Sequence, residues 1–90
     1  NLLLMQRSKA YFFKSTLKIH ALDRPQILAD ITVAIANLHI ALHSVNAREV
    51  KGGNCEISMT ISIESLEHLK NIVAKLSKIN GVYSIERSGM

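Results

Sequence analysis

The 90-residue sequence is poor in the residue types that mark several specialised protein classes. It contains one cysteine, one proline and no tryptophan. A single cysteine, Cys55, excludes a disulfide within the chain and a zinc site built on several cysteines. Because aromatic residues make up only 4%, a core must consist mainly of Ile, Leu and Val. No apolar stretch reaches the length of about 18 residues that a membrane-spanning helix needs, so we expect no contact with a membrane.

Sequence motifs of covalent chemistry are also missing. There is no Walker A sequence, no GxGxxG and no GxSxG. The four histidines are His20, His39, His43 and His68, and the sequence fixes no carboxylate beside any of them. We therefore expect no catalytic residues, no metal site and no cofactor, and interpret the histidines as surface or boundary residues. The lone thiol fits a reducing compartment, which favours a cytoplasmic location.

The charge balance leaves two interpretations of the surface open. A net charge of +4 permits contact with nucleic acid or another polyanion. The lysines and arginines, however, are scattered without a block of five, which is typical of an ordinary solvated surface. Charge alone therefore favours the ordinary surface over a specific nucleic-acid role.

Hydrophobic periodicity divides the chain into six elements that alternate in a regular order. Strict alternation predicts strands at 12–22 and 55–64, the second placing Cys55 in the core, and a weaker pattern predicts strands at 40–50 and 82–87. Helical spacing predicts helices over 25–38 and from Leu66 to Ile79, the second capped by Ser65 and the first with Leu28 on its apolar face. Gly52 and Gly53 indicate a hairpin turn at 51–54.

This order predicts an α+β fold of the ferredoxin-like βαββαβ type. We expect a four-stranded antiparallel sheet in the order 4-1-3-2, with two helices on one face. Residues 1–10 are interpreted as a linker or tag remnant, and residues 11–90 as the domain. The sheet then has one open face and two edge strands, which suit either pairing with a partner or ordinary exposure to solvent.

The stretch "ALDRPQILADIT" at 21–32 contains a charged corner between the first strand and the first helix. Pro25 suits the first helical turn, where its missing N–H is not needed. Asp23 is placed to accept hydrogen bonds from free N–H groups at the helix start. The same free N–H groups also suit the carboxylate of a bound ligand. The corner is therefore either a helix cap or a ligand site.

Four segments together resemble an ACT domain, the small regulatory module of enzymes of amino-acid metabolism, and in particular the C-terminal ACT domain of the RelA/SpoT family. That family comprises GTP pyrophosphokinases and (p)ppGpp hydrolases. The resemblance rests on "LKIHALDRPQILADIT" (17–32), "SVNAR" (44–48), "ISMTISIES" (57–65) and "LKNIVAKLSKINGVYSIER" (69–87).

The resemblance implies a non-catalytic regulatory domain of a GTP pyrophosphokinase that acts in the stringent response. It implies homo-oligomers that form through sheet edges, contact with other domains of the same chain, and a free amino acid at the strand-to-helix corner. The implied ligand-binding residues are Asp23, Arg24, Pro25, Gln26, Ile27, Leu28, Ala41 and Leu42.

Two positions depart from the ligand-binding pattern of the family. Gln26 stands where glycine is usual, and Ala41 stands where asparagine is usual. Both changes remove expected contacts to an amino acid, which favours subunit pairing or contact with ribosomal RNA. The residues expected to meet RNA are Arg24, Arg48, Lys51 and Arg87. An amino-acid sensor from another enzyme is the remaining alternative.

Overall fold

The structure, a computed structural model, describes residues 12–88. The predicted linker at 1–10 lies outside the described residues. The element order confirms the predicted βαββαβ arrangement. Its elements are β1 (Phe13–Leu22), α2 (Ile27–Asn37), β2 (Leu42–Val50), β3 (Asn54–Ile63), α3 (Leu66–Ser77) and β4 (Val82–Ser88).

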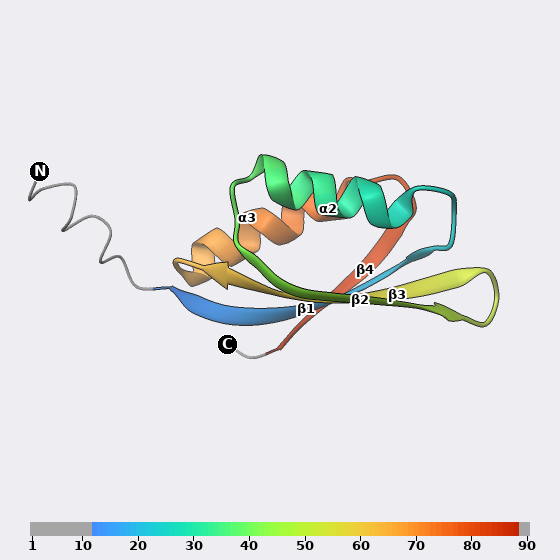
Figure 1. Cartoon of the computed structure of the whole chain (residues 1–90), viewed down its shortest axis with the longest axis horizontal. Coiled ribbons are helices and arrows are strands. Elements are labelled where there is room, and N and C mark those ends of the chain that lie inside the picture. Colours follow the sequence, from blue (N-terminus) through green and yellow to red (C-terminus); the bar gives the residue numbers. More distant parts are fainter. Residues whose placement is uncertain (1–11, 89–90) are drawn as a thin grey trace, which may run out of the picture.

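The four strands form one antiparallel sheet in the order β2-β3-β1-β4, which is the predicted order counted from the other edge. β1 and β3 are the central strands and pair along their full length, from Phe13 opposite Ile63 to Leu22 opposite Asn54. β2 and β4 are the edges. Both helices lie on one face of the sheet and leave the other face open (Figure 1).

Alternating apolar residues of the two central strands form the floor of the core. Leu17 and Ile19 of β1 and Ile57 and Ile61 of β3 are completely buried beneath the helices. The helices add residues at three- and four-residue spacing: Ile27, Ile31, Ile35, Leu69, Ile72 and Leu76. Cys55 is also buried, which confirms the predicted core position. Tight packing of these aliphatic side chains supplies the stability that the missing aromatic residues would otherwise provide.

Two leucines predicted to be in the core lie at its margin instead. Leu66 is 51% exposed and Leu28 is 39% exposed. Leu66 is the first residue of α3, and Leu28 lies in the first turn of α2. Leu66 therefore lies at the very end of its helix, whereas Leu28 follows buried Ile27 and points about 100° away from the side of α2 that Ile27 buries.

β2 differs from the other strands because the helix layer does not cover it. Eight of its nine residues are exposed. The register pairs Val45 with buried Met59 and Ala47 with buried Ile57, so these two residues face the same side as the core. The helix-side surface of β2, which includes Val45 and Ala47, is therefore open to solvent. We call this surface the shelf.

Candidate ligand site

The corner between β1 and α2 has an unusual backbone conformation. Gln26, the residue before α2, has φ 67° and ψ 11°, and its side chain makes no capping hydrogen bond. This left-handed conformation favours glycine, because a Cβ atom crowds the neighbouring carbonyl there. The positive φ thus gives a physical reason why glycine would suit this position. In this chain the position is occupied by Gln26, which carries a Cβ atom.

The predicted cap by Asp23 is wrong. Among the described residues, no hydrogen bond joins its carboxylate to the N–H groups at the start of α2, and its own N–H donates to the carbonyl of Gly53 at 2.9 Å. Pro25 lies in a turn two residues before the helix and not in its first turn. The predicted cap of the second helix is confirmed, because the Ser65 hydroxyl accepts from the N–H of His68 at 3.0 Å.

Arg24 holds the corner against the rest of the fold. Its Nε donates to the carbonyl of Asn80 at 2.8 Å, and its Nη1 donates to the carbonyl of Pro25 at 2.9 Å. Its Nη2 donates to Oδ2 of Asp30 at 2.7 Å. The guanidinium therefore links the corner, the first turn of α2 and the turn that leads into β4.

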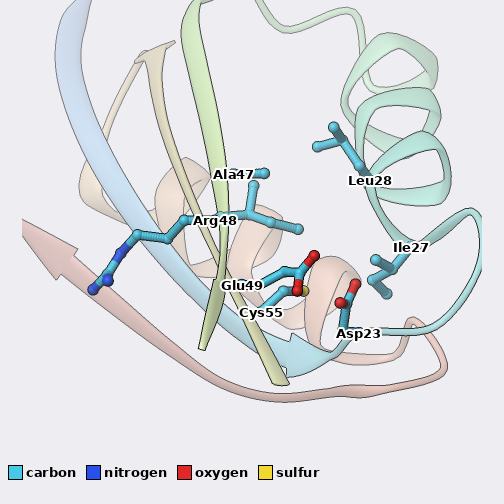
Figure 2. A pocket seen from close by; sticks show the side chains of 8 residues that line it. Asp23, Ile27, Leu28, Ala47, Arg48, Glu49 and Cys55 are labelled. Atoms are coloured by element: carbon cyan, nitrogen blue, oxygen red, sulfur yellow. The ribbon is translucent and has the colours of Figure 1, made fainter. Parts of the chain in front are cut away.

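A cavity of about 220 Å³ lies between this corner and the shelf of β2. We call it the corner cavity. Its apolar walls come from the first turn of α2 and from the inner face of the β2–β3 hairpin (Figure 2). The lining residues are Asp23, Ile27, Leu28, Ala47, Arg48, Glu49, Cys55 and Ile57.

The structure brings only part of the predicted ligand set together. Asp23, Ile27 and Leu28 line the corner cavity, whereas Pro25 and Gln26 do not. Arg24 lines a separate hollow with Asp30 and Asn80.

The second half of the predicted set lies elsewhere. Ala41 lines a hollow with His39, Ser62 and other residues, and its carbonyl accepts from the N–H of Ser62 at 3.1 Å. Leu42 pairs with Ile61 in the sheet. Since β2 continues for eight more residues to Val50 beside Asn54, these two positions lie at the end of β2 remote from the corner.

The sequence-based prediction missed the β2–β3 side of the cavity. The register places Glu49 directly opposite Cys55 and Ala47 opposite Ile57. The hairpin turn at 51–54 was visible in the sequence, and pairing the strands outward from it would have placed Glu49 near the corner.

The charged side chains divide between the two faces of the sheet. The carboxylates of Asp23 and Glu49 point into the space between the corner and β2, whereas the guanidinium of Arg48 points away from it (Figure 2). Arg48 donates from Nε to Oε2 of Glu56 on the open face at 3.0 Å. This hydrogen bond holds the pKa of Glu56 below its usual value against the opposing effect of desolvation.

The thiol of Cys55 forms part of the cavity floor. Its Sγ donates weakly to the carbonyl of Leu22 at 3.8 Å. Burial raises the pKa of this thiol, and the negative charge of Asp23 raises it further. The thiol is therefore a poor nucleophile, in line with the prediction of a core residue.

The open face of the sheet carries a row of polar side chains, two carboxylates among them, that crosses all four strands. Nε2 of His20 lies 3.3 Å from Oε2 of Glu86, and its Nδ1 lies 4.0 Å from Oε1 of Glu56. Glu56 in turn accepts a hydrogen bond from Arg48. Within residues 12–88, no group of three or more His, Cys, Asp or Glu side chains is arranged to hold a metal ion. No helix in the same range is long and apolar enough to cross a membrane.

The sequence profile of the ACT domain matches residues 9–87. The chain belongs to the ACT domain family. The fold agrees with this assignment: the structure superimposes on a crystal structure of the ACT domain from the GTP pyrophosphokinase of Chlorobium tepidum with a TM-score of 0.75. That alignment covers 87% of this chain and 100% of the other, at 22% sequence identity.

Two curated relatives of this ACT domain are larger proteins. It is 29% identical over 72 residues to a GTP pyrophosphokinase of Myxococcus xanthus, and 34% identical over 76 residues to a GTP pyrophosphokinase of Haemophilus influenzae. These alignments cover 80% and 83% of this chain but only 10% of each relative. In these relatives the matching segment is therefore one part of a much longer chain.

Proposed function

We propose that this ACT domain is a regulatory module of a cytoplasmic GTP pyrophosphokinase or (p)ppGpp hydrolase, and that it acts in the stringent response by self-association and contact with other domains. The observation that carries the proposal is the similarity of most of this chain to one segment of two GTP pyrophosphokinases. In this role the module relays a signal to catalytic domains elsewhere in the parent chain and performs no chemistry itself.

The shelf of β2 supports self-association. An edge strand exposes backbone groups that can pair with another strand, and proteins usually protect such edges. Val45 of β2 is 41% exposed, and within residues 12–88 the outer side of β2 pairs with no other strand, so the edge is both open and partly apolar. A second copy that pairs with β2 would cover these side chains and extend the sheet.

Sedimentation velocity of the 90-residue chain tests this proposal. We expect a concentration-dependent dimer, and we expect Val45→Lys to shift the equilibrium toward monomer by placing a charge in the interface. Val33→Lys is the matched control, because Val33 is 55% exposed on α2 and outside the shelf. A strict monomer at millimolar concentration, or equal effects of the two lysine variants, would contradict pairing through β2.

Binding of a small metabolite in the corner cavity is the second candidate function. It is favoured because three of the predicted ligand residues, Asp23, Ile27 and Leu28, line this cavity. A surface for ribosomal RNA is the weaker alternative, because Arg24 and Arg48 already pair with Asp30 and Glu56. Binding of L-leucine, followed by the amide chemical shifts of the lining residues, tests the second candidate.

A further inference from the structure

The lining of the corner cavity combines apolar side chains with two carboxylates. Ile27, Leu28, Ala47 and Ile57 provide aliphatic walls. Asp23 points into the cavity from the corner, and Glu49 points into it from β2 (Figure 2). A volume of about 220 Å³ lies below the range of about 300–1,000 Å³ that is typical for drug-sized ligands, so the cavity suits a small molecule.

No cationic side chain of the lining points into this cavity. Arg48 is the only lysine or arginine in the lining, and its guanidinium is turned to the open face, where it pairs with Glu56. Arg24 is committed to Asn80, Pro25 and Asp30. Neither guanidinium is therefore placed to receive the carboxylate of a bound ligand.

The positive end of the α2 dipole also lies at this corner, but Asp23 offsets part of it. Asp23 precedes the helix, whereas the charge of Asp30 in the first turn of α2 is already balanced by Arg24. A carboxylate near a helix N-terminus reduces its attraction for a further anion. The raised pKa of Cys55 is partly due to Asp23, which indicates that the negative potential reaches the floor of the cavity.

From the shape and charge of the cavity, we propose that it binds a small alkylammonium compound. The apolar stem packs between Ile27 and Ala47, and the ammonium group lies between the carboxylates of Asp23 and Glu49. This inference rests on the second candidate function, that the cavity binds a small metabolite, and it assigns the chemical class of that metabolite. An amine is preferred over an α-amino acid, because the extra carboxylate would face Asp23 and Glu49 without a side-chain cation to receive it.

Four probes with the same branched apolar tail separate the contributions of charge: isoamylamine (cation), isoamyl alcohol (neutral), isovalerate (anion) and L-leucine (both charges). Binding to the 90-residue chain is followed by the amide shifts of Ile27, Leu28 and Ala47. The rate at which a thiol reagent modifies Cys55 is a second readout, because Cys55 is the only cysteine. We expect isoamylamine to bind most tightly and to slow the modification, and we expect isovalerate not to bind.

Three variants test the placement of the ammonium group. Asp23→Asn and Glu49→Gln should each raise the Kd of isoamylamine by about two- to five-fold, as expected for exposed charge pairs, and the double variant should raise it more. Added salt should also raise the Kd of isoamylamine, because it screens the attraction between the ammonium group and the carboxylates. Glu86→Gln is the control, because Glu86 lies on the opposite face of the sheet beside His20 and should leave the Kd unchanged.

The outcomes separate the inference from the functions on which it rests. Binding of L-leucine or isovalerate that equals or exceeds that of isoamylamine would overturn the inference and leave metabolite binding intact. An unchanged Kd in the double variant would also overturn it. If no probe binds, both the inference and the second candidate function fail, whereas self-association is measured independently of either.

Discussion

Replacing Gln26 by glycine should stabilise this ACT domain. Gln26 has φ 67°, and its side chain is exposed and makes no capping hydrogen bond. A left-handed conformation costs an L-residue about 1–2 kcal/mol. Glycine avoids that cost, but it lowers the free energy of unfolding by about 0.4–1 kcal/mol because it gives the unfolded chain more conformational freedom. The expected net gain in the free energy of unfolding is therefore about 0.5–1 kcal/mol.

Urea denaturation and thermal unfolding followed by circular dichroism measure this gain. For a domain of this size it corresponds to a rise in Tm of about 2–8 °C. Gln26→Ala is the matched control, because alanine removes the amide but keeps the Cβ atom that causes the crowding. We expect Gln26→Ala to change the free energy of unfolding by less than about 0.5 kcal/mol, as is usual for an exposed site.

Two results would refute this reasoning. If Gln26→Gly is no more stable than Gln26→Ala, the left-handed backbone costs no more than the roughly 0.4–1 kcal/mol that glycine loses through its unfolded chain, which is less than the cost assumed here. His39 also has a positive φ, of 57°, and lies just after α2. His39→Gly should therefore gain a similar amount, and opposite signs at the two positions would show that φ alone does not decide the effect.

Three further predictions concern polar contacts. Ser65→Ala should lower the free energy of unfolding by about 1 kcal/mol through loss of the α3 cap, as measured by urea denaturation. Arg24→Met should lower it by about 1–2 kcal/mol and shift the NMR signals of the turn at Asn80. Because the pKa of Glu56 is lowered, its stabilising contribution is present above its unfolded pKa and is lost as the pH falls through its folded pKa. Arg48→Gln should raise that pKa, which a carboxyl NMR titration measures.

The fold could be predicted from the sequence because each central element has one clear period. β3 alternates strictly from Cys55 to Ile63, and the structure buries the inward set of residues. β2 alternates poorly, and the structure gives the reason: the helices do not cover it, so both of its faces tolerate polar residues. The order of strands followed from chain connectivity and the number of helices, and it was confirmed.

The candidate site was harder to predict because it depends on contacts between distant segments. The family resemblance placed ligand residues at the corner, but Glu49 is brought to the same cavity as Asp23 only through the pairing of β2 with β3. The spacing of residues along the sequence also does not predict where an arginine side chain points. Arg24 and Arg48 were both expected to be available for a ligand or for RNA, yet each is paired with a carboxylate.

The predicted cap at the start of α2 was wrong because the sequence does not show how many residues the turn before the helix needs. An Asp before a Pro often indicates a helix N-terminus, and the sequence contains that signal. Here the chain needs two more residues to turn, and Gln26 takes the left-handed conformation that completes the turn. A glutamine does not itself indicate a positive φ, and the hint in the sequence was indirect: related domains usually carry glycine at this position.

The central position of β1 has a consequence for how the chain folds. β1 is synthesised before the other three strands of this sheet, and its partners come much later. Thr16 contacts Thr60, 44 residues further along, and His20 contacts Glu86, 66 residues further along. The β2–β3 hairpin is the local unit that can form early, whereas β1 must wait for both β3 and β4. Such non-local pairing slows folding. During translation, the most apolar strand pair of the domain therefore stays incomplete until β3 has emerged, and a chaperone that binds β1 would protect it in that interval.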